Sequence, residues 1–205
     1  MLAIIIPYYK ITFFEATLQS LANQSDKRFK VYIGDDASPE DPVALLEKYK
    51  DQFDFVYHKF EKNLGGTSLV KQWGRCIDLA KSEKWLMILG DDDVLGLNVV
   101  EEFFKCIQEK EKLINVIRFA SCKIDNLGSE ISKIYKNPVI EKSIEFIFRE
   151  ARSSLSEYIF KKEQVIDIGF KKFPLAWFSD VLAVIEFSNF DIIQIRVFKY
   201  AYKVF

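Results

Sequence analysis

The first half of the chain alternates short apolar runs with segments of helical periodicity. Four apolar runs have the length of buried strands, at residues 2–6, 29–33, 53–58 and 85–89. Three segments between them have helical spacing, at residues 14–23, 41–49 and 69–81, and Thr12 and Glu15 have the spacing of a capping box before the first. This alternation predicts an α/β fold with a mainly parallel central sheet and helices on both faces.

The second half has less regular periodicity. Helical spacing recurs at residues 99–109, 141–150, 162–168 and 181–187, and Gly169 is expected to end the third of these helices. Strands are predicted at residues 116–122 and 158–160, with a hairpin turn at 125–128 and a returning strand at 131–135. No repeat or linker separates the halves, so one domain over residues 1–205 is expected, with halves 1–95 and 96–205.

Polar residues follow three of the predicted strands at the point where each strand ends. These turns are residues 7–10, 35–38 and 91–93. Parallel sheets bind ligands beyond the carboxyl ends of their strands. Acidic side chains that are far apart in the sequence are therefore expected to meet in one crevice.

The aspartate triplet is the most specific of these turns. Asp91, Asp92 and Asp93 follow the apolar run 85–89 with only Gly90 between them. Three crowded carboxylates repel one another, and a divalent cation with the phosphates that it bridges would compensate them. The alternative is a polar loop that caps the next helix.

Further candidates lie on the same predicted edge. Asp35 and Asp36 can accept a hydrogen bond from a nucleotide base or a ribose hydroxyl, and the alternative is an Asx turn before Pro39. Gly65 permits close approach of a backbone to a ligand, although the chain has neither a P-loop nor a dinucleotide-binding glycine pattern. Lys71 is a candidate counter-charge for a diphosphate, or else a solvated lysine.

Asp180 is the remaining candidate acid. It follows the aromatic pair Trp177-Phe178 and precedes the apolar helical segment 181–187. A carboxylate at the rim of an apolar pocket is suited to remove a proton from a hydroxyl group. The alternative is a carboxylate that only caps the helix.

Charge, cysteine content and the lengths of the apolar runs exclude several kinds of binding partner and indicate a cellular compartment. The 205 residues carry a net charge of −1, which gives no basic field for a nucleic acid. Cys76, Cys106, Cys122 and His58 lack zinc-site spacing, and three cysteines without a framework indicate reduced thiols. Residues 1–6 are too short for a signal peptide, and no run is long enough to span a membrane. The chain is expected to be cytoplasmic, with attachment to a membrane surface left open.

The ordered motifs resemble those of family 2 glycosyltransferases, which are inverting sugar transferases with the nucleotide-diphosphosugar (GT-A) fold. The resemblance spans nearly the whole chain. It rests on five motifs: Ile4-Ile5-Ile6-Pro7-Tyr8-Tyr9, Leu18-Gln19-Ser20-Leu21-Ala22-Asn23-Gln24, Asp35-Asp36-Ala37-Ser38, Asn63-Leu64-Gly65 and Leu89-Gly90-Asp91-Asp92-Asp93-Val94-Leu95.

The resemblance implies a role for each matching residue. The nucleotide pocket would be lined by Pro7, Tyr8, Tyr9, Asp35, Asp36, Gly65, Lys71, Asp91 and Asp92. Asp91 and Asp93 would form the DxD motif that binds Mg²⁺ or Mn²⁺ and the diphosphate, although the alignment leaves the metal ligand open between Asp92 and Asp93. Asp180 would be the general base.

The resemblance also implies substrates and a setting. The donor would be a nucleotide-diphosphate sugar, with a UDP-sugar favoured, and the acceptor a saccharide or a lipid-linked sugar. The protein would then take part in the synthesis of a surface polysaccharide or another glycan, at the inner face of the membrane.

The sequence departs from the family pattern at several positions. Gly90 stands where the first acid of the common motif belongs, and Ser179 replaces the first acid of the later pair. Tyr8 and Lys10 replace a Thr and an Asn, Lys71-Gln72 replaces Arg-Asn, and a C-terminal extension is expected to be missing. Two alternatives stay open: a catalytically silent nucleotide- or carbohydrate-binding module, and a sugar-phosphate nucleotidyltransferase. The latter would be expected to carry a basic Gly-rich loop after its first strand.

Overall fold

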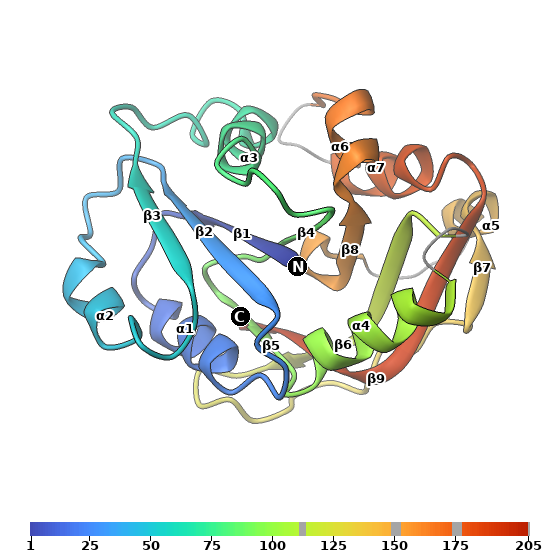
Figure 1. Ribbon diagram of the computed structural model, residues 1–205, viewed down its shortest axis with the longest axis horizontal. Helices are drawn as coiled ribbons and strands as arrows, with labels where there is room; N and C mark the ends of the chain where they lie inside the picture. Colours follow the sequence, from blue (N-terminus) through green and yellow to red (C-terminus); the bar gives the residue numbers. More distant parts are fainter. Residues whose placement is uncertain (111–113, 149–152, 174–177, 205) are drawn as a thin grey trace.

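A continuous mixed sheet runs through the protein, with helices on both of its faces (Figure 1). The computed structural model describes residues 1–110, 114–148, 153–173 and 178–204. Its longest path of neighbouring strands has the order β3-β2-β1-β4-β8-β6-β9-β5, and β7 pairs with β9. The predicted α/β architecture with helices on both faces is therefore confirmed.

The four strands predicted in the first half form one block of neighbouring parallel strands in this sheet. They are β1 (Leu2–Tyr8), β2 (Phe29–Asp35), β3 (Phe55–Lys59) and β4 (Trp85–Ile88). β1 extends through Pro7, where the sequence predicts its end. Pairing with β4 stops at Ile5, so the missing amide hydrogen of Pro7 falls on a side of β1 that no longer has a neighbouring strand.

Successive side chains of β1 point to opposite faces of the sheet, and each face is covered by its own set of helices. Ile4 and Ile6 pack with α1 (Phe14–Ala22), α2 (Val43–Glu47) and α4 (Val99–Lys110). Ala3 and Ile5 pack in the core of the opposite face with α3 (Leu69–Ile77), α5 (Ser143–Phe148), α6 (Lys162–Ile168) and α7 (Ser179–Phe187). None of the helices in the described ranges is long and apolar enough to cross a membrane.

Residues 93–204 add five strands to the sheet and a 3-10 helix beside it. These elements are β5 (Asp93–Leu95), β6 (Val116–Ile124), β7 (Ile140–Lys142), η1 (Leu155–Glu157), β8 (Tyr158–Lys161) and β9 (Ile192–Val204). β8 enters antiparallel between β4 and β6, and β9 runs parallel to β6. The sheet is thus continuous from the predicted nucleotide half into the predicted acceptor half.

Several predicted elements differ from the observed ones. The strand expected at 131–135 does not form: Tyr135 makes one isolated bridge to β6, and Glu130, just before the expected strand, makes another. β9, which was not predicted, pairs with β6. The helix expected at 141–150 begins only at Ser143, after β7, and residues 149–150 lie outside the described ranges. α1 begins after Phe13 without a side-chain cap, so the predicted capping box of Thr12 and Glu15 does not form. α3 ends at Ile77, four residues before the predicted end.

A buried ion pair holds η1 against β6. The Arg118 guanidinium donates to the Glu157 carboxylate at 3.0 and 3.2 Å, and both side chains are almost fully buried. The Ser121 hydroxyl donates to the other Glu157 oxygen at 2.6 Å, and Arg118 also donates to Asn137 at 2.9 Å. Removing one partner of such a pair leaves an uncompensated buried charge.

We expect Glu157→Ala to lower the free energy of unfolding by about 3–5 kcal/mol, because the Arg118 charge would stay buried without its carboxylate. Urea denaturation measures this change. Glu47→Ala, which removes the carboxylate of an exposed pair with Lys50, is the matched control and should cost less than about 1 kcal/mol. Equal losses for the two variants would show that the buried pair is not structural.

Candidate functional site

The aspartate triplet lies in a tight turn between β4 and β5. The turn, residues 90–93, is called the acid turn below; the amide of Asp93 closes it by donating to the carbonyl of Gly90 at 3.2 Å. Asp91 and Asp92 occupy the two central positions, and Asp93 is the first residue of β5. The triplet therefore stands at the carboxyl end of β4, as the sequence predicts.

The carboxylate of Asp91 joins the acid turn to the loop that follows β1. One of its oxygens accepts the amides of Tyr9 and Lys10, at 2.7 and 2.8 Å. Burial, the largest cause, raises the pKa of Asp91, and the two amide bonds oppose this rise. Its backbone carbonyl accepts from the Thr17 hydroxyl of α1 at 3.1 Å. Asp91 thus ties the ends of two neighbouring strands together.

Asp92 and Asp93 turn toward one point above Gly90. A Cβ atom added to Gly90 would lie 2.8 Å from an oxygen of Asp92 and 2.9 Å from one of Asp93. Asp93 is 4% exposed and accepts the hydroxyl of Ser156, a residue of η1 that the sequence analysis missed. Gly90, noted as a departure from the family pattern, therefore leaves room for two carboxylates.

The acid turn suits a hard divalent cation in its chemistry. Mg²⁺ is commonly bound by one or two carboxylates together with substrate phosphates, rather than by a complete protein cage. Asp92 and Asp93 supply two such carboxylates at one point. Among the described residues, no group of three or more His, Cys, Asp or Glu side chains is arranged to hold a metal without a ligand. The residues present thus fit a cation that is shared with a phosphate-bearing ligand.

Asp35 is buried at the carboxyl end of β2. It is 0% exposed, and its carboxylate accepts the Ser38 amide at 2.7 Å and the Tyr57 hydroxyl at 2.6 Å. The contact with Ser38 is the Asx-type turn that the sequence offered as the alternative. In this arrangement Asp35 holds the turn after β2.

The Asp36 carboxylate binds the backbone of residues 63–66, which precede α3 and are called the 63–66 loop below. Its carboxylate accepts the amides of Leu64 and Gly65, at 2.7 and 2.8 Å, and also the Arg75 guanidinium. A Cβ on Gly65 would lie 2.6 Å from this carboxylate, so the glycine permits close approach to Asp36. From the sequence, Gly65 is expected to allow close approach to a ligand, whereas here the group that approaches it is the Asp36 carboxylate.

Arg75 is a cation at this edge that sequence reasoning missed. It lies one helical turn after Lys71 on α3, and its guanidinium lies 3.9 Å from the centre of the Phe60 ring. Lys71 itself is exposed and has no ion partner within the described part of the chain. The spacing of the two cations along a predicted helix was the signal that could have identified Arg75.

The residues that end β1 differ in their exposure. Tyr8 is 0% exposed, its ring packs 4.7 Å from that of Phe14, and burial raises its pKa to about 12. Tyr9 is 41% exposed at the surface, while Pro7 is only half-buried. Of the three predicted pocket residues, Tyr9 therefore offers the most accessible ring, and Tyr8 belongs to the core.

Asp180 lies in the first turn of α7 and is half-buried. Phe178, at the N-cap, is 68% exposed and has a φ of 62°, and Trp177 lies outside the described residues. Burial chiefly raises the pKa of Tyr158, and the Asp180 carboxylate adds to that rise. Asp180 is thus within electrostatic range of a residue that follows η1, whose Ser156 contacts the acid turn.

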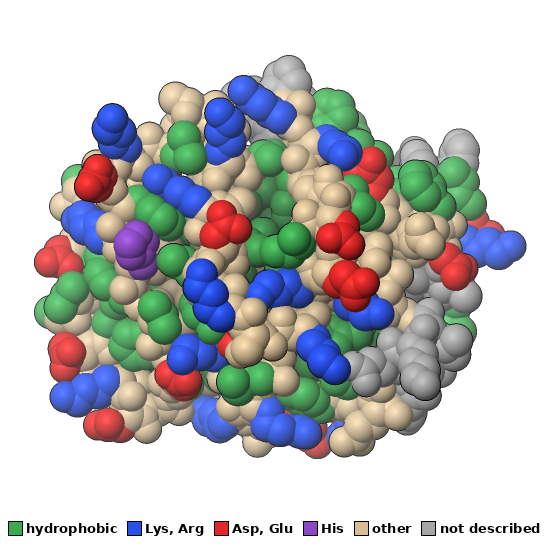
Figure 2. Space-filling view, turned by 45° about the horizontal axis from the view of Figure 1, so that its top comes forward, with side chains coloured by type: hydrophobic (Ala, Val, Ile, Leu, Met, Phe, Trp, Pro, Cys, Tyr) green, Lys and Arg blue, Asp and Glu red, His purple; other side chains and the backbone are tan. Residues whose placement is uncertain are grey.

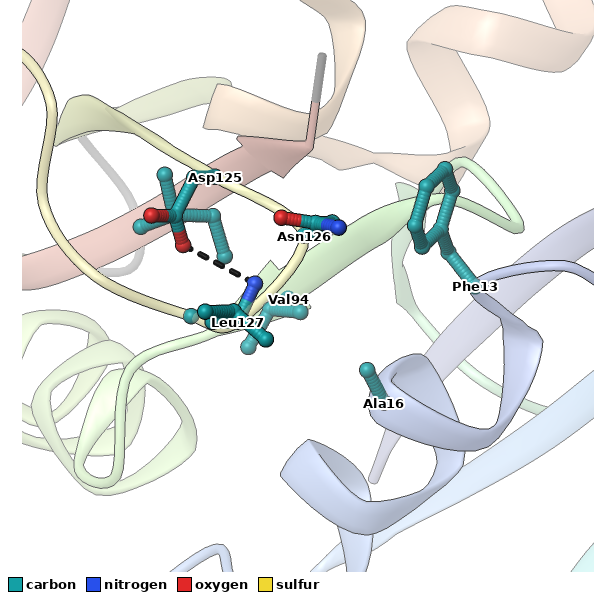
Figure 3. A pocket seen from close by; sticks show the side chains of 8 residues that line it. Phe13, Ala16, Val94, Asp125, Asn126 and Leu127 are labelled. Atoms are coloured by element: carbon teal, nitrogen blue, oxygen red, sulfur yellow. Dashed lines mark hydrogen bonds between the residues drawn. The ribbon is translucent and has the colours of Figure 1, made fainter.

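Two cavities lie near these elements. One, of about 390 Å³, lies between α1, β5 and the 125–128 turn, and is lined by Phe13, Ala16, Val94, Ile124, Asp125, Asn126, Leu127 and Gly128 (Figure 3). The other, of about 530 Å³, is lined by residues 58–62 and Arg75. None of the site residues predicted from the sequence lines either cavity. On the face shown in Figure 2, acidic and basic side chains are interspersed among apolar ones.

Comparisons with known proteins agree with this fold. The model of the family described as Glycosyl transferase family 2 matches residues 3–168. The glycosyltransferase GlyG of Streptococcus pneumoniae serotype 4 is 22% identical over 112 residues, which make up 54% of this chain and 36% of that protein. The chain therefore spans only about a third of this curated relative.

Solved structures of S. aureus TarS share the architecture. A TarS fragment of residues 1–349 in complex with UDP-GlcNAc has a TM-score of 0.77 and 18% identity, and the match covers 100% of this chain and 58% of that fragment. Its complex with UDP gives a TM-score of 0.75 and covers 60% of the fragment. The predicted GT-A fold is confirmed by this likeness.

We expect Gly65→Ala to destabilise the protein by about 1–3 kcal/mol, because the new Cβ would crowd the Asp36 carboxylate at 2.6 Å. Gly74→Ala is the matched control, since Gly74 lies in α3 with nothing within 4 Å of its added Cβ. That control should gain about 0.5–1 kcal/mol from helix propensity. Chemical denaturation of both variants measures the two changes, and a gain for Gly65→Ala would contradict the contact.

Asp91 should make stability depend on pH in a definite direction. Because its pKa is raised on folding, the folded protein holds this proton to higher pH than the unfolded chain, whose aspartates titrate near about 4. The contribution of Asp91 to stability should therefore fall as pH rises from about 4 through the folded pKa.

Asp91→Asn removes this dependence, so the variant should gain stability relative to the natural protein between pH 4 and pH 7. Thermal unfolding across this range measures the difference. Asp51→Asn, at an exposed aspartate, should show a nearly constant difference. A constant difference for Asp91→Asn as well would contradict the assignment.

Proposed function

Because its residues 3–168 match the family model, this chain belongs to glycosyl transferase family 2, and we propose that it transfers a sugar from a nucleotide-diphosphate sugar to an acceptor hydroxyl. The neighbouring TarS structures contain UDP-GlcNAc and UDP, which supports a UDP-sugar as donor. The match covers the whole of this chain and 58–60% of the TarS fragment.

One observation carries the proposal. The segments that follow β1 and β4 are joined by a carboxylate, through Asp91 to the amides of Tyr9 and Lys10. After β2, Asp36 joins the 63–66 loop and Arg75 in the same way. Polar groups from separate strand ends thus form one edge, which is where open α/β sheets bind their ligands.

Within this edge, the donor would lie across the ends of β1, β2 and β4. The exposed Tyr9 ring would lie against the nucleotide, and Asp36 or Asp35 would bind the base, as the resemblance implies. Asp35 is fully buried and both of its oxygens accept hydrogen bonds within the protein, so Asp36 is the acid that a base would reach, through its remaining lone pairs. Arg75 and Lys71 would supply positive charge near the nucleotide.

The acid turn is proposed to bind the diphosphate through Mg²⁺ or Mn²⁺. When bound, the cation would stabilise charge on the departing diphosphate. The resemblance names Asp91 and Asp93 for this motif, while the geometry favours Asp92 beside Asp93, because Asp91 already accepts two backbone amides. We propose that Asp91 shapes the turn and that Asp92 faces the ligand.

Asp180 is proposed to be the general base. Its carboxylate would accept the proton of the acceptor hydroxyl, whose oxygen then attacks the anomeric carbon from the side opposite the diphosphate, with inversion. Asp180 lies half-buried in the first turn of α7, near η1, whose Ser156 contacts the acid turn. The acceptor is proposed to be a saccharide or a lipid-linked sugar, in polysaccharide or glycan synthesis on the cytoplasmic side of a membrane.

We expect UDP with Mn²⁺ to raise the melting temperature by about 5–10 °C at a hundredfold excess over Kd. Asp92→Asn should remove the part of this shift that requires Mn²⁺ and keep the part that UDP gives alone, because only the charge of one carboxylate is lost. Asp51→Asn, at an exposed position, serves as the control and should respond like the natural protein. A broad screen of nucleotides and metals without any shift would refute the proposed donor class.

We expect Asp180→Asn to lower turnover by about 10²–10⁴-fold while UDP affinity stays unchanged, since only the proton acceptor is removed. Release of UDP from UDP-sugars, with water or a supplied saccharide as acceptor, measures turnover. Binding of nucleotide by the natural protein without turnover under any of these conditions would favour a silent binding module.

A further inference from the structure

The hydroxyl of Ser156 connects the two ends of the acid turn. The Gly90 amide donates to the Ser156 oxygen at 3.2 Å, and the Ser156 hydroxyl donates to the carboxylate of Asp93. The turn is closed a second time by the bond from the Asp93 amide to the Gly90 carbonyl. A side chain more than sixty residues away in the sequence thus completes the turn.

Ser156 is held firmly in this place. It is 4% exposed and lies in η1, next to Glu157. The Glu157 carboxylate is fixed by hydrogen bonds from Arg118 and Ser121 of β6. The next residue, Tyr158, is the first of β8, which pairs with β4. The position of the hydroxyl is therefore set by the buried ion pair and by the sheet, and not by the acid turn itself.

The two bonds of Ser156 restrict the directions of the acids. Gly90 and Asp93 are both bonded to the Ser156 hydroxyl, and Asp91 is bonded to the loop after β1. Within the described residues, Asp92 is the member of the triplet whose carboxylate has no hydrogen bond. It approaches the same point above Gly90 as Asp93 does. The bonds made by Gly90, Asp91 and Asp93 thus restrict where the Asp92 carboxylate can lie.

We propose that Ser156 is a positioning residue, which orients the acid turn so that Asp92 and Asp93 can bind a divalent cation together with a nucleotide diphosphate. This inference rests on the proposed function. Ser156 would act through Asp93 and Gly90, without contact to the sugar. A preorganised turn avoids the loss of conformational freedom that binding would otherwise require.

The test uses Ser156→Ala in the full chain, with Mn²⁺ and UDP as probes. Titration of Mn²⁺ at saturating UDP should give an affinity about ten- to hundredfold weaker, the range expected when one hydrogen bond to a charged group is lost. Affinity for UDP without metal should change less than about threefold. Ser154→Ala is the matched control, because Ser154 precedes the same 3-10 helix and makes no side-chain cap bond.

A second variant covers the event that Ser156→Ala does not fold. Ser156→Cys keeps the shape of the side chain but has a weak hydrogen-bonding group, and it should also weaken Mn²⁺ binding. Unchanged Mn²⁺ affinity in either variant overturns the inference, as does an equal loss of UDP affinity without metal, which indicates a general structural role. If the natural protein shows no Mn²⁺-dependent UDP binding, the proposed function fails first and the inference with it.

Discussion

The bond between the Asp91 carboxylate and the amides of Tyr9 and Lys10 is the contact on which the site depends. Carboxylates that leave water must be compensated by donors, and backbone amides at strand ends are well suited to this. Because the amides belong to the loop after β1 and the carboxylate to the turn after β4, the contact fixes two neighbouring strand ends relative to each other. Burial, the largest cause, and the nearby Asp92 raise the pKa of Asp91, while the two amide bonds lower it.

The same principle recurs along the edge of the sheet. Asp36 draws the 63–66 loop and Arg75 toward the end of β2, and Asp35 closes the turn that follows it. Acids that look like ligand-binding groups in the sequence therefore also hold the turn and the loop at this edge of the sheet. A carboxylate with several lone pairs can serve both purposes, but its bonded oxygens are then oriented by the protein.

The sequence predicted the parallel half of the fold well, because apolar runs buried on both faces leave a strong signal. It could not predict β9, or that η1 would bring Ser156 to the acid turn, because both depend on pairings between distant segments. The triplet was located correctly from its place after β4. Which of its acids faces a ligand depends on the amides of Tyr9 and Lys10, and local sequence does not encode such contacts.

In the proposed site, Asp91 shapes the acid turn while Asp92 and Asp93 would face the cation. A crystal structure with UDP and Mn²⁺, with the metal located by its anomalous scattering, tests this most directly. We expect a manganese peak within coordination distance of the Asp92 carboxylate, bridged to the diphosphate, with Asp91 still bonded to both amides. A peak coordinated by Asp91 with the amides released, or a nucleotide bound away from the acid turn, would contradict it.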